Sequence, residues 1–493
     1  MLKLVVSVCL LVGGCTLQFS SVSAARAAEA SAVFKSDQLR TDFKIVRQAL
    51  NEAHPDLCRY TSKEKMDHEW NRAGDSLSGP MNALEFYRVL APLIALVRDG
   101  HMGLSLPNNV EEQLVQSPIL PFGVRMVGRT PYVFRDFSGQ VATLAGREIV
   151  SINGVAASKL VEAMLAVVTA DGDGESARRL SIGERFAGNI VKICDLHAPY
   201  QVVLRDPKSK QTETNRLDGL VSGSLYKLWR SKWPDDIEVR MERPPSELEF
   251  IDNGAIARMR IPGWGSSEED AKRRDLRNFF EHAFEEFATH KTRALIIDVR
   301  NNGGGEDEVA QILASHLIQK PFRYYRDIVL KGTSFNFYKY VTAPDPIPTD
   351  LVTRGTDGRF HFTGHPSMGL KSPREPGFGG ALFLLMNGGS FSTSTEFLAA
   401  IRSHRPATFI GEESSGAYGG NNSGFEPTMT LPATKLTLRI PLAAYYMDVT
   451  GPWPARRGVM PDVTTTYSIE EMLKGVDKEL ETALSLARAP KET

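Results

Sequence analysis

The sequence predicts an α/β protein whose C-terminal part, residues 248–493, is built on a mostly parallel sheet. Short apolar stretches such as RALIIDV and ALFLLM have the composition of strands that are buried on both faces. Between them lie longer segments with helical spacing of apolar residues, such as EDAKRRDLRNFFEHAFEEFATH and EVAQILASHLI. Strands that alternate with helices in this order indicate parallel strands joined by crossover helices.

The first 30 residues predict an exported protein. MLKLVVSVCLLVGGC has one lysine, then an apolar run, then small residues, as a secretory signal peptide does. Val12-Gly13-Gly14-Cys15 resembles a bacterial lipobox, which implies lipid attachment at Cys15, whereas Val22-Ser23-Ala24 and Ala25-Arg26-Ala27 are sites for ordinary cleavage. We expect a periplasmic protein or a lipoprotein anchored in the outer membrane of a bacterium, with the lipid as its only membrane contact.

Three further parts precede the α/β region. Residues 31–115 carry apolar residues at helical spacing and predict an N-terminal helical region. Residues 116–205 form a β-rich module, in which LAGREIVSINGV resembles PDZ-like domains, whose known members bind peptides at a sheet edge. An unrelated β-α module is the alternative. Residues 206–247 are polar and interrupted, which predicts a linker.

Charge and cysteine content narrow the class of function. The 493 residues carry a formal net charge of -1, which argues against a dedicated nucleic-acid binder. Apart from Cys9 and Cys15 in the leader, Cys58 and Cys194 allow one disulfide but no disulfide framework. The histidines show no zinc-ligand pattern, so we expect neither a metal nor a cofactor.

The first strand-to-helix turn that could take part in binding or catalysis runs from Asn302 to Gly305, after a strand that ends at Val299. Its glycines allow backbone N–H groups to face a cavity next to the positive end of a helix dipole. Such a turn is able to hold a phosphate, a carboxylate or an oxyanion. The spacing matches neither GxGxxG nor the P-loop, which disfavours a nucleotide site.

The second turn is NGGSFSTSTEF, from Asn387 to Phe397. Thr393 and Glu396 fit a capping box, with Thr393 as the N-cap of a helix. This leaves Ser392 just outside the helix, where its hydroxyl would point outward beside the N–H of the next residue. A nucleophile followed by its own oxyanion donor requires this geometry.

Together these motifs resemble the tail-specific (C-terminal-processing) serine peptidase family, which includes the tricorn-type peptidases. The resemblance rests on DVRNNGGG and GGSFSTSTEF, and extends in the same order along the chain to DGH, GEESSG and GVMPDV. It implies a crotonase/ClpP-like α/β core with an N-terminal helical region and an inserted PDZ-like module. It also implies a peptide or protein substrate, with its C-terminus as one candidate for the part recognised.

The resemblance makes Ser392 the nucleophile of a serine peptidase. The glutamate that the family usually carries three residues after the serine is Thr395 here, and Glu396 falls one residue later. An alternative register therefore assigns the nucleophile to Thr393, and the hydroxyls of Ser390 and Ser394 stay open as candidates.

The resemblance makes His101 the general base. The lysine that one branch of the family uses would fall at Ala417, so the Ser/Lys dyad is not supported, whereas DGH resembles the histidine site of the tricorn-like branch. In the tricorn-type site the residue immediately before this histidine helps to hold the ring; here that residue is Gly100, so this support is missing or supplied elsewhere. The oxyanion would be bound by the N–H of Thr393 and by an N–H of Gly303 or Gly304. Asp448 and Glu412 are the candidates for the third catalytic residue.

Two functions are consistent with these patterns. The first is an exported serine peptidase that forms an acyl-enzyme on Ser392. The second is a peptide- or lipid-binding protein without catalysis on the same fold, since the displaced glutamate and the missing lysine depart from the family pattern. The sequence does not define the oligomeric state.

Overall fold

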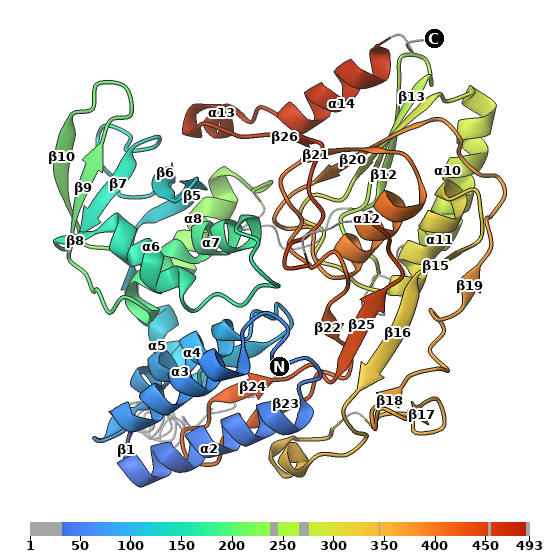
Figure 1. Ribbon diagram of the computed structural model, residues 1–493. Coiled ribbons are helices and arrows are strands. Elements are labelled where there is room, and N and C mark those ends of the chain that lie inside the picture. The colour runs from blue at the N-terminus through green and yellow to red at the C-terminus, as the bar shows by residue number, and fades with distance from the viewer. Residues whose placement is uncertain (1–31, 237–244, 266–275, 345, 452–454, 490–493) are drawn as a thin grey trace, which may run out of the picture.

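A computed structural model describes most of the chain after the leader (Figure 1). The described residues are 32–236, 245–265, 276–344, 346–451 and 455–489. The predicted signal peptide and its Cys15 lie outside them. The N-terminal helices, the β-rich module and the α/β core adjoin one another in Figure 1.

The core is a six-stranded sheet in which the strands follow chain order. The first strand is antiparallel to its neighbour, and all other neighbours are parallel, so the predicted, mostly parallel sheet is confirmed. In order across the sheet, the strands are β12 (Glu247–Ile251), β13 (Ile256–Arg260), β14 (Ala294–Asp298), β20 (Ala381–Met386), β21 (Thr408–Gly411) and β26 (Val463–Thr464).

Helices cover both faces of this sheet. Leu295 and Ile297 of β14 pack into the same apolar cluster as helices α10 (Leu276–His290), α11 (Asp307–Leu317) and α12 (Thr393–His404). Ile296 points to the opposite face, where it packs with α14 (Lys478–Arg488). Because successive strand residues face opposite sides, a strand covered on both faces needs apolar residues at consecutive positions, which explains ALII before the ion-paired Asp298.

A second layer of strands extends the core beside α12. It comprises a five-stranded sheet of β17 (Thr353–Arg354), β18 (Phe360–His361), β16 (Tyr325–Leu330), β25 (Ala443–Met447) and β22 (Asn422–Ser423), and the pair β15 (Phe322–Arg323) and β19 (Leu370–Lys371). The short helix η1 (Asn336–Tyr340) and the helix α13 (Ile469–Lys474) lie in the connections.

The β-rich module has its own sheet and apolar core. Its sheet runs β10 (Thr212–Leu217), β9 (Tyr200–Arg205), β7 (Glu148–Ile152), β6 (Thr130–Asp136) and β5 (Phe122–Val127), with β8 (Val155–Ala156) paired to β7 and the helices α6 (Ala157–Leu165) and α7 (Ser176–Lys192) against it. The predicted linker, 206–247, is partly wrong, because β10 and the helix α8 (Ser222–Lys232) fall within it. Five of the six β10 side chains are polar and the strand lies at the sheet edge, so it lacks the apolar alternation of a half-buried strand.

The N-terminal region is helical, as predicted, and a strand connects it to the core. Strand β3 (Gly103–Ser105) is the edge of a three-stranded sheet whose other members come from the end of the chain. Figure 1 shows this region, in blue, beside the orange β23 and β24. The helices of this region are α2 (Ser36–Ala53), α3 (Lys63–Ser76), α4 (Ala83–Leu96) and α5 (Asn108–Gln116). The two strands that pair in series with β3 are β24 (Thr437–Arg439) and β23 (Thr428–Thr430). Two short strand pairs are β1 (Val33–Phe34) with β2 (Met81–Asn82), and β4 (Pro118–Ile119) with β11 (Leu220–Val221).

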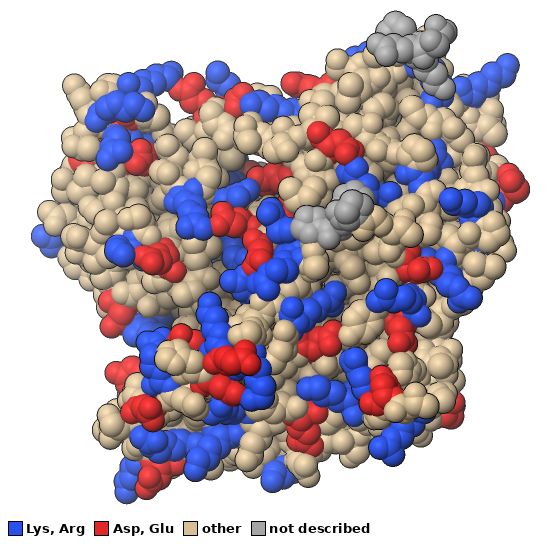
Figure 2. All heavy atoms as spheres, viewed as in Figure 1, with Lys and Arg blue, Asp and Glu red and all other residues tan. Residues whose placement is uncertain are grey.

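The distribution of surface charge agrees with the near-neutral net charge of the sequence (Figure 2). Figure 2 shows basic and acidic side chains interspersed over one face of the molecule. Cys58 and Cys194 are free thiols, so the disulfide that the sequence allows is not formed. None of the helices in the described residues has both the length and the apolar character of a membrane span.

Candidate active site

Ser392 occupies a strained turn between β20 and α12. Its backbone has φ 55° and ψ -126°, a conformation that costs a non-glycine residue of order 1–3 kcal/mol and is concentrated at functional sites. Ser392 is the N-cap of α12, but its side chain makes no capping hydrogen bond. The predicted capping box is therefore wrong: Thr393 is the first helical residue, and the Glu396 carboxylate is buried against Tyr325 and Asn421 instead of capping the helix.

The other hydroxyls of the run are engaged in structural hydrogen bonds. Ser390 Oγ donates to the Val299 carbonyl at 2.8 Å, and Thr393 Oγ1 donates to the Gly305 carbonyl at 2.7 Å. Ser394 Oγ accepts a hydrogen bond from the Trp264 indole at 2.8 Å. Each of these bonds ties the turn to a neighbouring segment.

His101 lies directly opposite Ser392. Its Nε2 is 3.1 Å from Ser392 Oγ, a hydrogen-bond distance between a hydroxyl and a base. The Phe391 ring packs against the imidazole with 4.6 Å between centroids, so the residue before the serine fixes the face of the ring. Strand β3, which starts two residues after His101, is paired with β24 of the C-terminal part and holds the loop in place.

Burial keeps the His101 ring neutral. The side chain is 7% exposed, and burial lowers the pKa of His101 to about 4. The charge of Asp99 opposes this effect, while that of Arg439 adds to it. At neutral pH the imidazole is therefore unprotonated and able to accept a proton.

Backbone donors adjoin the serine. The N–H groups of Thr393 and Gly303 have no acceptor among the described residues, whereas the Gly304 N–H donates to Asn302 Oδ1 at 3.0 Å. Of the N–H groups that the sequence suggested as oxyanion donors, those of Thr393 and Gly303 therefore stay free within the described residues, and that of Gly304 does not. Gly304 has a different role: a Cβ there would lie 2.8 Å from Ser392 Cβ, so only glycine allows this close approach.

Asp99 stands behind the histidine and is a residue that the sequence interpretation missed. Its Oδ1 accepts the backbone N–H of His101 at 2.8 Å, and its Oδ2 is bound by His54 at 2.9 Å and by Asn422 at 3.0 Å. Burial opposes the ionisation of Asp99, but the hydrogen bond and charge of His54 lower the pKa of Asp99 overall. The DGH motif contained this residue, but nothing in the sequence indicated its partners.

The two candidates for a third catalytic residue do not contact the histidine. Glu412 pairs with Arg179 of the β-rich module at 2.8 Å. The backbone of Asp448 bonds to Tyr324 and to His404, and within the described residues no hydrogen bond or ion pair joins its carboxylate to His101. The carboxylate that does lie near His101, that of Asp99, is bound by His54, which ends α2.

One group of side chains in the described residues has the atoms to hold a cation. Asp99, His101 and Asp171 bring ligand atoms within 4.8 Å of one another. Since Nε2 of His101 faces Ser392, this group of side chains is part of the site around the serine.

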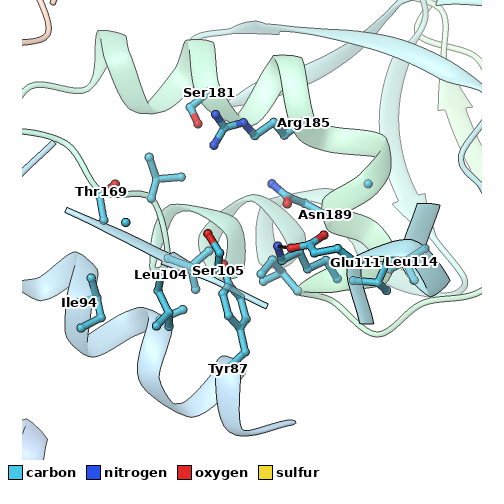
Figure 3. A pocket seen from close by; sticks show the side chains of 18 of the residues that line it. Tyr87, Ile94, Leu104, Ser105, Glu111, Leu114, Thr169, Ser181, Arg185 and Asn189 are labelled. Carbon is cyan, nitrogen blue, oxygen red and sulfur yellow. Dashed lines mark hydrogen bonds and ion pairs between the residues drawn. The ribbon is translucent and has the colours of Figure 1, made fainter. Parts of the chain in front are cut away.

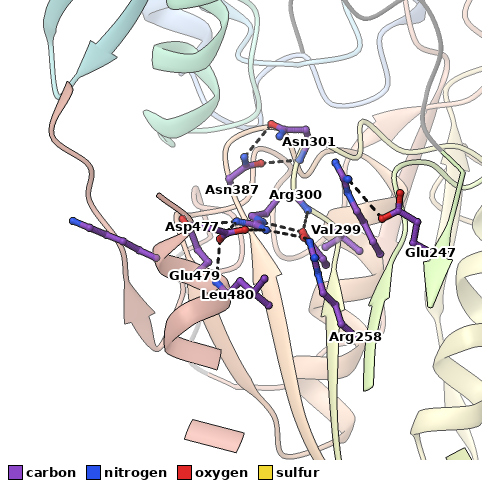
Figure 4. Close-up of polar contacts among 12 residues, drawn as sticks. Glu247, Arg258, Val299, Arg300, Asn301, Asn387, Asp477, Glu479 and Leu480 are labelled. Atoms are coloured by element: carbon purple, nitrogen blue, oxygen red, sulfur yellow. Dashed lines mark hydrogen bonds and ion pairs between the residues drawn. The ribbon is translucent and has the colours of Figure 1, made fainter. Parts of the chain in front are cut away.

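Polar networks fix the two turns relative to each other (Figure 4). The side chain of Asn387 accepts from the Asn301 N–H and donates to the Asn301 side chain, both at 3.0 Å, which joins the glycine turn to the serine turn. Beside them, Arg300 binds Asp298 at 2.7 Å and Asp477 at 2.6 Å, so an ion-pair network joins the glycine turn to the start of the C-terminal helix.

A cavity of about 620 Å³ adjoins the His101 loop. Gly100 and Met102, on either side of His101, line it together with the free edge of β3. Figure 3 shows Arg185 and Asn189 of α7 facing Ser105 and Tyr87 across this space, so the cavity separates the N-terminal region from the β-rich module.

An α/β core that holds a serine on a strained turn opposite a neutral histidine defines a serine-hydrolase type of site. Residues 255–465 match the model of peptidase family S41. This match includes both turns and Ser392, though not the N-terminal region or the β-rich module, and it supports a serine-type peptidase, whose substrates are peptides or proteins.

Two solved structures of mature CPAF share the fold. Mature CPAF matches with a TM-score of 0.59 and 14% identity over 92% of this chain and 97% of that chain. Mature CPAF complexed with lactacystin matches with a TM-score of 0.61 and 14% identity over 92% of this chain and 98% of that chain. The photosystem II D1 C-terminal processing protease is 15% identical over 92% of this chain and 97% of that chain, with a TM-score of 0.41. A comparison with curated protein sequences found no match.

Proposed function

We propose that this peptidase cleaves peptide bonds through an acyl-enzyme on Ser392, with His101 as general base. The observation that carries the proposal is the 3.1 Å separation between Ser392 Oγ and His101 Nε2. The N–H groups of Thr393 and Gly303, which have no acceptor among the described residues, support an oxyanion site beside the nucleophile.

In the first half of the reaction, Ser392 Oγ attacks the peptide carbonyl while its proton moves to His101 Nε2. The carbonyl oxygen becomes an oxyanion, which the N–H of Thr393 and that of Gly303 stabilise. The C–N bond then breaks, and His101 returns its proton to the leaving amine. In the second half, water loses a proton to His101 and attacks the ester; the C–O bond to Ser392 then breaks, and His101 returns the proton to Oγ, which releases the acid and restores the serine.

We propose that the peptide lies along the free edge of β3 and extends into the adjoining cavity. Strand β3 is paired on one edge only, and an extended peptide is able to add to the other edge through main-chain hydrogen bonds. Because β3 begins two residues after His101, a peptide bound there would lead toward Ser392. Recognition of a substrate C-terminus, and a peptide-binding role of the β-rich module, are part of this proposal.

We also propose that the protein is exported, either as a soluble periplasmic protein or as a lipoprotein acylated at Cys15. The apolar leader that stops at this cysteine supports the lipoprotein. Mass spectrometry of the mature N-terminus, with Cys15→Ala as the comparison, distinguishes the two forms.

A fluorophosphonate probe tests the mechanism with the wild type, Ser392→Ala and His101→Ala. We expect labelling of the wild type at Ser392, none in the serine variant and strongly slowed labelling in the histidine variant. An unlabelled wild type from which a bound peptide or lipid is recovered would instead indicate a binding protein.

A further inference from the structure

One ring nitrogen of His101, Nδ1, is buried without a hydrogen-bond partner among the described residues. When Nε2 accepts the proton of Ser392, this other ring nitrogen carries the hydrogen. The Asp99 Oδ1 lies 4.0 Å from Nδ1 and already accepts the backbone N–H of His101, so Asp99 alone does not orient the ring.

Asp171, from the β-rich module, supplies a second carboxylate at this place. Its Oδ1 accepts the N–H of Gly100 at 2.7 Å, across 71 residues of sequence. Its Oδ2 is buried and makes no hydrogen bond of normal distance and angle in the described chain, although the backbone of Ala417 lies close enough to the carboxylate to favour its ionised form. The side chain is 6% exposed, and one of its oxygens lies within 4.8 Å of both a ring nitrogen of His101 and a carboxylate oxygen of Asp99.

The loop that carries Asp171, residues 170–176, is held from two sides. The Gly172 N–H donates to the Arg98 carbonyl at 3.2 Å, next to the catalytic loop. Asp173 forms ion pairs with both Arg98 and Arg456, and its N–H donates to the Arg456 carbonyl at 2.7 Å. Ser176 Oγ donates to the carbonyl of Glu413 in the core at 2.7 Å. Asp171 is therefore fixed beside the histidine by the docking of the module.

We propose that Asp171 is the positioning residue of His101: it holds the Gly100–His101 backbone and presents a carboxylate to the Nδ1 side of the ring. This inference rests on the proposed function of Ser392 and His101. A ring that burial keeps neutral is a weak base unless a negative group stabilises its protonated form. Asp171 and Asp99 together provide this negative charge.

The charge environment makes this role dependent on pH. Burial, followed by the charge of Asp99, raises the pKa of Asp171 to about 7, while the Gly100 N–H opposes the rise. The carboxylate therefore forms as pH increases through neutrality, and activity should rise with it. The ionisable groups that face the Asp171 carboxyl are Arg59, Tyr60, Asp99, His101, Arg178 and Glu396.

The test compares Asp171→Asn with Asp195→Asn in the full chain. The asparagine side chain of the first variant keeps an oxygen for the Gly100 N–H but loses the charge. Asp195 is an exposed residue of the same module, with positive φ that asparagine tolerates, and serves as the control. Both variants are measured by the rate of fluorophosphonate labelling, by kcat and KM for a peptide substrate over pH 4 to 9, and by thermal unfolding.

We expect Asp171→Asn to slow labelling and kcat by about 10- to 100-fold at pH 8, at or below the usual contribution of acid–base catalysis, with KM nearly unchanged. The step of the wild-type profile near pH 7 should disappear, and the remaining activity should fall only toward pH 4, where His101 is protonated. Asp195→Asn should match the wild type.

Each contrary result has a distinct meaning. A labelled wild type with an Asp171→Asn variant of equal rate and pH profile would overturn the positioning role. Loss of activity together with lower thermal stability, but with an unshifted pH profile, would assign Asp171 a structural role and equally overturn it. Failure of the proposed function itself is recognised separately, because then the wild type is not labelled at Ser392.

Discussion

His101 Nε2 and Ser392 Oγ are 3.1 Å apart, although 291 residues separate them along the chain. The pairing of β3 with β24 brings the N-terminal loop to the core, and the Phe391 ring packs on the imidazole. Two contacts independent of the hydrogen bond itself therefore hold the pair together. A site assembled from distant segments is expected to depend on their docking as much as on the reacting groups.

Among the hydroxyls of the serine turn, only Ser392 should be essential for chemistry. Ser392→Ala is expected to reduce kcat by at least about 10³-fold without loss of stability, since its side chain makes no capping bond. Ser390→Ala and Ser394→Ala should retain labelling but lower the free energy of unfolding by about 1–3 kcal/mol, because each leaves buried partners unsatisfied. Probe labelling combined with urea unfolding checks this. Normal activity of Ser392→Ala would exclude it as nucleophile.

The sequence was sufficient for the core and for the two turns. The continuous apolar residues of β14 indicated a strand that is covered on both faces, and the glycines between Asn302 and Gly305 indicated a turn after it. The role of Glu396 was not predictable in the same way. Its spacing from Thr393 fits a capping box, but its partners, Tyr325 and Asn421, come from elements that the local pattern does not describe.

The groups behind the histidine were missed for a related reason. His54, Asp99 and Asp171 meet through tertiary contacts between the N-terminal helices and the β-rich module. Spacing rules describe neighbours on one helix or strand, so they carry no information on such pairs. The polar edge strand β10 escaped prediction because its side chains gain little from burial.

Gly304 should be far less tolerant of alanine than Gly303. Gly304 has φ +109°, and an added Cβ would lie 2.8 Å from Ser392 Cβ, so Gly304→Ala must displace the nucleophile. An added Cβ on Gly303 meets no atom within 4 Å, and its N–H is retained. We expect kcat to fall by about 100-fold or more in Gly304→Ala, and by a much smaller factor in Gly303→Ala. Equal losses in both variants would show that the close approach is unimportant.

Glu396 should make stability depend on pH. Burial, then the charge of Asp307, raises the pKa of Glu396 to about 7 from an ordinary value of 4.5. Because the folded pKa is the higher one, the contribution of the neutral carboxyl to stability is complete below about pH 4.5 and is lost as pH rises through 7.

The matched variant is Glu396→Gln, which cannot ionise. Tyr325 is able to donate to its amide oxygen, and the unpartnered Oδ1 of Asn421 is able to accept from its amide nitrogen. Relative to the wild type, the variant should gain about 2–3 kcal/mol of unfolding free energy between pH 5 and pH 8. Urea unfolding at several pH values measures the difference. A difference that does not change with pH would contradict the raised pKa.

The ion pair between Arg300 and Asp298 should contribute more to the free energy of unfolding than a pair exposed on the surface. Asp298 is nearly fully buried, and removing the guanidinium leaves it with Arg258 as its remaining cationic partner, at 3.1 Å. Arg300→Ala is therefore expected to lower the free energy of unfolding by about 3 kcal/mol, as loss of one partner of a buried pair does. Arg488 pairs with Asp252 on the surface, where solvent screens the charges, so Arg488→Ala should lower the free energy of unfolding much less than Arg300→Ala. Urea unfolding of both variants provides the comparison, and equal costs would show that the Arg300 network behaves as an exposed pair.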